Sequence, residues 1–316
     1  MSVAIQPAPS VTLLGPQTMS FGQLREAIAG LEVEGMVAVI TAGWQEQECD
    51  DHALRDAIGL PSVNLALHAR SEEVAAEDPE LWAALNEKQR RLRLQQDFYR
   101  IRLDAVDDAA RAIAVRHVAE EVLADERAMT VSQLRHIDQE HLHRCVDAHA
   151  DFDGQWRPVE RPAVAKHHEE LVARVAEAAL VVIAGGHVVS QLNRIRLFGL
   201  HRVLESKPLI AWSAGAMALA ERIVLFHDAP PFGKNIAQVV DAGLGLCPGV
   251  VVMPHLDQRV RVTEAAGIAR FAQRMAPARC LGFNPDARAT FRGGALTEAS
   301  VDRLCPSGEI ERGWRP

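Results

Sequence analysis

Two short apolar segments, each followed at once by small residues, constrain this chain more than any other feature. Residues 180–183 are Leu-Val-Val-Ile and lead into Ala-Gly-Gly, and residues 208–212 lead into Ser-Ala-Gly-Ala. A continuous apolar run without alternation is typical of a strand buried on both faces of a parallel sheet. The second segment, with a helical pattern over 217–223, has the layout of a nucleophile elbow, in which a serine occupies a sharp strand-to-helix turn.

The segments on either side of this pair alternate between strand and helix patterns, which predicts a doubly wound, mostly parallel sheet flanked by helices. The expected strands are 11–14, 35–40, 61–67, 250–253, 280–283, 289–291 and 294–296, and the expected helices are 21–31, 50–58, 193–205 and 263–275.

The alternation stops over a long central stretch. Between residues 71 and 179 the sequence shows no convincing strand, which is too long for an ordinary connection. We therefore predict a single α/β domain spanning 1–316, interrupted by an all-helical insertion at about 71–179. The insertion either caps the site, forms a homodimer interface, or does both, and the sequence leaves these alternatives open. Its expected helices are 79–103, 107–123, 131–148 and 164–178.

Composition excludes several classes of function. The formal net charge of −8 disfavours non-specific binding to nucleic acid or anionic membranes. The five cysteines are scattered without C-x-x-C spacing, so neither a disulfide framework nor a zinc site is expected. The first residues lack the pattern of a signal peptide, and no apolar run is long enough to cross a bilayer. A cytoplasmic location is the expectation.

A serine nucleophile needs a base and a group that orients that base. Ser213 is the candidate nucleophile. His255 follows the expected strand 250–253 and is the candidate base, because open α/β sheets place their sites at the carboxyl ends of the strands. Asp228 follows the elbow helix and is the candidate acid, with His227 beside it as another candidate partner.

The backbone N–H groups of Gly186 and Ala214 are candidates for the oxyanion hole, since Gly185 and Gly186 lack side chains that would keep the backbone away. Each feature also has a simpler explanation: a tight small-residue turn, a loop histidine, or a solvated acid. The order of the features along the chain favours a hydrolase.

The segments 212–216 (Trp-Ser-Ala-Gly-Ala) and 243–255, which ends in Met-Pro-His, resemble the serine peptidase family of dipeptidase E and cyanophycinase. The resemblance extends from residue 180 to about residue 296. It implies a fold like that of class I glutamine amidotransferases and no cofactor. It also implies cleavage of a peptide or isopeptide bond in a small peptide, with Ser213 as nucleophile, His255 as base and Asp228 as acid.

The chain departs from the family where the substrate is held. Ala211 replaces a glycine, His187 replaces an Asp or Asn, and Met253-Pro254 replaces an acid and a glutamine. The resemblance therefore does not imply aspartyl specificity for this chain. The candidate substrate-binding residues are Gly185, His187, Arg259 and Arg261, the arginines because a guanidinium binds a carboxylate in a bidentate fork; two surface arginines are the alternative.

Two other functions stay open. A non-catalytic binding or assembly protein would use the altered residues 187–189 and 253–254 for recognition, and the helical insertion as a partner surface. An esterase or acyltransferase shares the order Ser, Asp, His, although the short spacing between Ser213 and His255 is unlike that fold.

Other patterns in the chain suggest no further site. The histidines between 136 and 149 show no H-E-x-x-H, so solvated side chains are expected there and no metal. Neither a dinucleotide motif nor a nucleic-acid site is expected; the arginine-rich stretch 90–102 is interpreted as a solvated or partner-facing helix.

Overall fold

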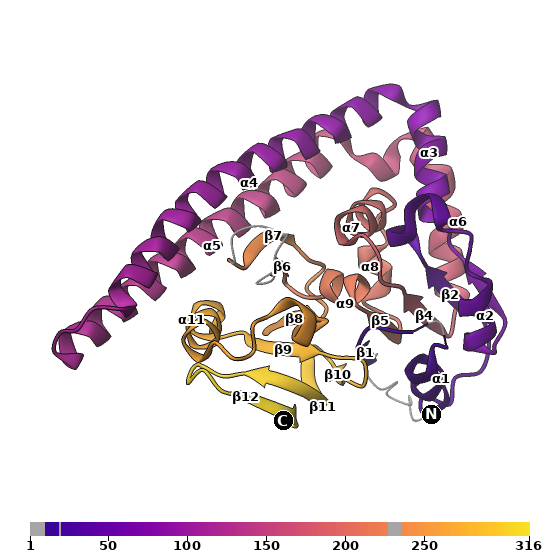
Figure 1. Ribbon diagram of the computed structural model, residues 1–316. Helices are drawn as coiled ribbons and strands as arrows, with labels where there is room; N and C mark the ends of the chain where they lie inside the picture. Colours follow the sequence, from indigo (N-terminus) through magenta and orange to yellow (C-terminus); the bar gives the residue numbers. More distant parts are fainter. Residues whose placement is uncertain (1–9, 19, 227–235) are drawn as a thin grey trace, which may run out of the picture.

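The computed structural model describes residues 10–18, 20–226 and 236–316. Within them, ten strands form one sheet in the order β3-β2-β4-β5-β1-β10-β11-β9-β8, with β12 paired to β11 (Figure 1). The strands are β1 Ser10–Leu14, β2 Val37–Ile40, β3 Ser62–Asn64, β4 Leu180–Ile183, β5 Leu209–Trp212, β8 Val250–Pro254, β9 Arg279–Phe283, β10 Arg288–Arg292, β11 Ala295–Leu304 and β12 Ile310–Trp314.

The strands β3, β2, β4, β5 and β1 are parallel to one another, whereas β10 and β11 continue the sheet in antiparallel pairs. In the register of β4 and β5, Ile183 lies opposite Ala211. The residues that follow these two strands, Gly185 and Ser213, therefore lie at the same edge of the sheet.

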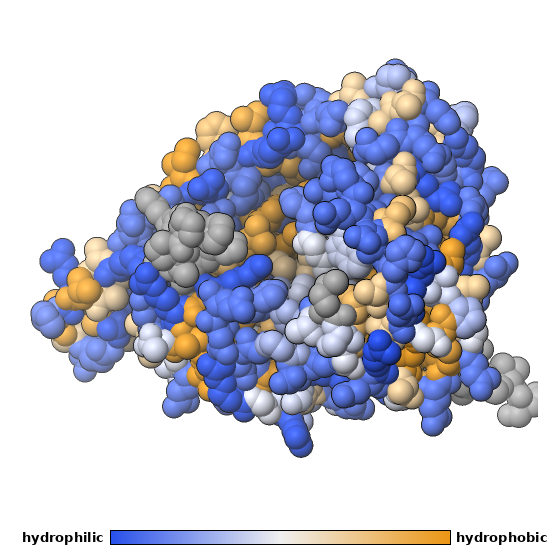
Figure 2. Space-filling view, turned by 45° about the vertical axis from the view of Figure 1, so that its right-hand side comes forward, coloured by the Kyte–Doolittle hydropathy of each residue, from blue (hydrophilic) through white to orange (hydrophobic). Residues whose placement is uncertain are grey.

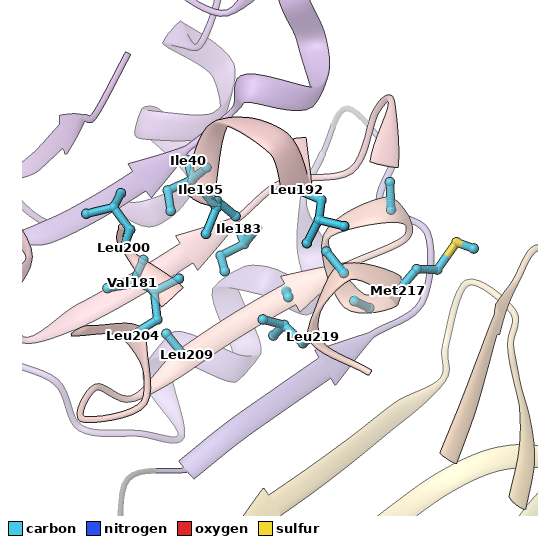
Figure 3. Packing of buried hydrophobic residues seen from close by; sticks show 14 of the residues in the cluster. Ile40, Val181, Ile183, Leu192, Ile195, Leu200, Leu204, Leu209, Met217 and Leu219 are labelled. Atoms are coloured by element: carbon cyan, nitrogen blue, oxygen red, sulfur yellow. The ribbon is translucent and has the colours of Figure 1, made fainter. Parts of the chain in front are cut away.

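Helices cover both faces of the parallel part. On β4, Val181 and Ile183 pack against one helical layer, and Leu180 and Val182 pack against the other. Figure 3 shows the first layer, where side chains of α7, α8 and α9 meet the strands. Complete burial of each such side chain stabilises the fold by about 1.5–3 kcal/mol. The doubly wound sheet predicted from the sequence is confirmed. The helices are α1 Gly22–Ala29 and α2 His52–Ile58 on one face, and α6 Pro162–Glu177, α7 Val188–Leu197, α8 His201–Leu204 and α9 Ala214–Leu219 on the other.

The central helical region is built around a long antiparallel hairpin of α4, Pro79–Ala114, and α5, Glu120–Trp156, which extends along one side of the molecule (Figure 1). The short helix α3, Leu67–Glu77, precedes it. The breaks expected after residues 103 and 123 were wrong, because both helices continue through them. Residues 104–106 and 124–130 contain neither glycine nor proline, so no residue there interrupts either helix.

A buried polar network attaches this hairpin to the rest of the molecule. The Tyr99 hydroxyl of α4 donates to Asp138 Oδ1 of α5 at 2.8 Å, and Arg274 pairs with the same carboxylate at 2.6 Å. The N–H of Val239 donates to the Tyr99 hydroxyl at 3.0 Å. The network therefore joins the hairpin to α11, Ala265–Met275, and to β7, Gln238–Ala242.

The strand β7 pairs with β6, Arg222–Leu225, in a separate two-stranded sheet that the sequence did not predict. The elbow helix expected up to residue 223 ends at Leu219. Within the described residues, no helix combines the length and apolar character needed to span a membrane.

Candidate active site

Ser213 lies at a sharp turn between β5 and α9, with φ 48° and ψ −119°. A positive φ is uncommon for a residue with a side chain, and such conformations cost about 1–3 kcal/mol. The turn packs closely against the residues that follow β4. A Cβ on Gly215 would lie 2.6 Å from the carbonyl oxygen of Ala184, and one on Gly185 would lie 3.1 Å from the Cβ of Ser213. The small residues that flank the serine are thus required by the approach of this turn to the end of β4.

His255 directly follows β8 and also has a positive φ, 58°, at the start of the short helix α10, Leu256–Arg259. Its N–H donates to the carbonyl of Phe283 at 2.9 Å, which fixes the backbone at this point. Burial, and then the positive charge of Arg259, lower the pKa of the His255 imidazole. The neutral form, which can accept a proton, is therefore favoured at neutral pH.

Ser213 and His255 border one cavity of about 570 Å³ at the carboxyl edge of the parallel strands. Within the described residues, neither side chain forms a hydrogen bond. Catalytic hydrogen bonds are often long without substrate and tighten in the complex. The cavity is lined by Pro16, Gln17, Thr18, Phe21, Trp44, Gly185, Gly186, His187, Val188, Val189, Trp212, Ser213, Ala214, Met217, Leu225, Pro254, His255 and Arg259.

Three aromatic residues of this lining, Phe21, Trp44 and Trp212, were not predicted as site residues. Phe21 packs edge-on against Trp212, with ring centroids 6.0 Å apart. Their positions in the sequence could have indicated that they border the site, since Trp212 is the last residue of β5 and Phe21 and Trp44 each follow a parallel strand.

The turn after β4 packs backbone against backbone. Gly186 has φ 116°, and a Cβ there would lie 2.4 Å from the carbonyl oxygen of Gly43. The same oxygen accepts the N–H of His187 at 2.7 Å. Within the described part of the chain, the N–H groups of Gly186 and Ala214 donate to no acceptor. For Ala214 this follows from its place in the first turn of α9, where N–H groups lack intrahelical partners.

His187 is the N-terminal cap of α7. Its Nδ1 accepts the N–H of Ser190 at 3.1 Å, so this nitrogen carries no proton and the ring orientation is fixed. The side chain is exposed at the edge of the cavity, beside Val188 and Val189. His187, which stands where the family has Asp or Asn, therefore has a structural role as the cap of α7.

The two candidate arginines lie in different places. Arg259 borders the cavity with Ser213 and is half-buried, and in the described part of the chain its guanidinium has neither an ion pair nor a hydrogen bond. Burial lowers its pKa. Arg261 borders a different cavity and pairs with Glu264 at 3.1 Å. The structure thus does not bring Arg261 together with the other candidate residues.

The candidate acid Asp228 and its neighbour His227 lie outside the described residues. In the helix α5, the expectation of solvated histidines was wrong for two residues. His141 stacks on Tyr99 with ring centroids 4.2 Å apart, and His149 Nε2 lies 2.8 Å from Asp241 Oδ1; both histidines are buried. Each is used in packing the hairpin, and among the residues that the structure describes no group of three potential ligands gathers around a metal position.

The fold and cavity define an α/β protein in which a strained serine after β5 and a partly buried histidine after β8 border one cavity. Residues 135–278 match the model of peptidase family S51. The predicted resemblance to the family of dipeptidase E is therefore confirmed over these residues, which include Ser213 and His255.

Among solved structures, the chain is similar to the "Putative Peptidase E Protein from Listeria monocytogenes EGD-e". The identity is 12%, the match covers 94% of this chain and 99% of that one, and the TM-score is 0.44. No curated protein matches significantly.

Proposed function

We propose that this protein is a serine hydrolase that cleaves a peptide or isopeptide bond of a small peptide through an acyl-enzyme on Ser213. One observation carries the proposal: a serine in a strained turn borders the same cavity as a histidine whose neutral form is favoured. The match to peptidase family S51 supports a peptidase-like hydrolase.

In the proposed reaction, the Ser213 hydroxyl oxygen attacks the substrate carbonyl carbon while His255 accepts the hydroxyl proton. The carbonyl π electrons move to oxygen, and the N–H groups of Gly186 and Ala214 stabilise the resulting negative charge. Each such donor is worth about 2.7–4 kcal/mol. The C–N bond then breaks, and His255 returns its proton to the leaving amine. Water then attacks the acyl carbon while His255 accepts one of its protons. The bond from the acyl carbon to the Ser213 oxygen breaks, and His255 returns that proton to the oxygen, which releases the acid and restores both side chains. Asp228 orients His255 in this proposal.

The cavity supports a small substrate with a carboxylate. The half-buried guanidinium of Arg259 offers two parallel donors, and arginine binds carboxylates in this way. Gly185 and the exposed ring of His187 would contact the substrate near the bond that breaks. Arg261 has no substrate-binding role in this proposal, because its side chain borders another cavity.

The first test uses a fluorophosphonate probe, which labels an activated serine. We expect labelling of the wild-type protein, none of Ser213→Ala, and unchanged labelling of Ser206→Ala, which removes an exposed serine. Hydrolysis of a panel of aspartyl and other short peptides should follow the same pattern. Equal labelling or equal hydrolysis by wild type and Ser213→Ala would refute Ser213 as nucleophile.

The second candidate function is a non-catalytic binding or assembly protein. The exposed apolar side chains on the long hairpin favour it, because such surfaces commonly contact partners. An unlabelled, properly folded wild-type protein would support this candidate over the hydrolase. In either case we propose a cytoplasmic location, which the five free thiols support, since cysteines stay unpaired in a reducing compartment.

A further inference from the structure

The outer face of α4 carries an apolar stripe in the open. Leu94, Phe98 and Ile101 are 46%, 62% and 65% exposed. They are separated by four and three residues, and Ala105 follows four residues later, which is the alternating spacing of a coiled-coil seam. We call these four residues the α4 stripe. Figure 2 shows apolar side chains along the outer edge of the hairpin.

The stripe is not needed to hold the hairpin together. Other residues of α4, Tyr99 and Leu103, face inward and are fully buried in a cluster with Leu134 and Ile137 of α5. The helix α5 in turn lies against β7 and α11, so α4 is the outer member of the pair (Figure 1). A partner can therefore reach the α4 stripe along its whole length.

The charges at the two ends of the stripe have opposite sign. Arg91 precedes Leu94 and Asp108 follows Ala105, each at the next position of the seam on the same face of the helix. Both side chains are exposed, whereas the neighbouring Arg90 is paired with Glu87 at 2.5 Å. A helix with a basic end and an acidic end attracts a copy of itself in the antiparallel direction and repels a parallel copy.

From this pattern we propose that two copies of the chain associate antiparallel along α4, with a two-fold axis between residues 99 and 100. In this register Phe98 faces Ile101 of the second copy, and Leu94 faces its Ala105. Arg91 then faces Asp108. Each contact occurs twice because the interface is isologous.

Sedimentation velocity of the full chain tests the proposal. We expect a dimer for the wild type, and for Phe98→Glu a dissociation constant raised roughly 30-fold or more, as for an interface hot spot. Phe98 is mostly exposed, so its replacement should leave the circular dichroism spectrum and the melting temperature unchanged. The matched control is Met36→Glu, an exposed apolar residue outside the hairpin, which should stay dimeric. A monomeric wild type, or a Phe98→Glu dimer of unchanged affinity, would overturn the proposal.

The antiparallel register has its own test. Arg91→Glu should weaken the dimer, and adding Asp108→Arg should restore it. In a Cys49→Ser background, which removes the exposed cysteine, a mixture of Phe98→Cys and Ile101→Cys chains should form a mixed disulfide dimer. Failure of the double charge reversal to restore association, or the absence of the mixed disulfide, would refute this register.

Discussion

The conformation of Ser213 predicts an unusual order of stability for two inactive variants. Both Ser213→Ala and Ser213→Gly remove the hydroxyl, but only alanine keeps the Cβ that makes φ 48°, ψ −119° unfavourable. Glycine relieves strain of about 1–3 kcal/mol. Its extra backbone entropy in the unfolded chain costs roughly 0.5–1 kcal/mol. The difference predicts that Ser213→Gly is more stable than Ser213→Ala by up to about 2.5 kcal/mol.

The assay is denaturant unfolding of both variants under identical conditions, comparing the free energy of unfolding. Ser71 in the interior of α3 provides the matched control, because its backbone is helical and either substitution removes the same hydroxyl contact to the carbonyl of His68. There the order should reverse, with the glycine variant less stable by about 0.5–1 kcal/mol. If Ser213→Gly is also the less stable of its pair, the serine turn stores no strain and the reasoning fails.

Four further outcomes are expected. The pKa of His255 is lowered, and the base must be neutral, so kcat/KM should fall only as the pH drops below about 6.5. Arg259→Gln removes a positive charge, so the decrease in kcat/KM at low pH should occur at a higher pH. If this decrease occurs at the same pH as in the wild type, the charge of Arg259 has no effect on His255. Gly215→Ala, whose Cβ would lie 2.6 Å from two backbone oxygens, should lower the free energy of unfolding by about 1–3 kcal/mol in a denaturant titration. Asp138→Ala leaves Arg274 buried without its carboxylate partner, so it should lower the free energy of unfolding by about 3–5 kcal/mol. An unchanged melting temperature of this variant would show that the network does not hold the hairpin.

Much of the sheet could be predicted because a continuous apolar run, such as Leu-Val-Val-Ile at 180–183, is typical of a parallel strand that is buried on both faces. The meeting of Ser213 and the glycines after β4 followed from the same logic, because residues that end neighbouring parallel strands share an edge. His255 follows β8, at the other end of the sheet, and borders the same cavity only through the packing of distant segments.

The errors have a common physical origin. The hairpin β6–β7 is amphipathic and short, and its strands are stable only against α5 and β8, which local patterns do not reveal. The buried positions of His141 and His149 arise from contacts with α4 and β7 on a helix whose sequence is mostly polar. Arg259 and Arg261 are two residues apart, yet the backbone turns after α10 and sends their side chains to different cavities.

The sequence by itself determined which segments are strands of the parallel sheet and which residues stand at their ends, because burial on two faces demands a composition that is visible locally. Only the tertiary structure decided the strained backbone of Ser213 and the meeting of Phe21, Trp44 and Trp212 at one cavity. These depend on how closely one backbone approaches another, which is a property of packing between distant segments.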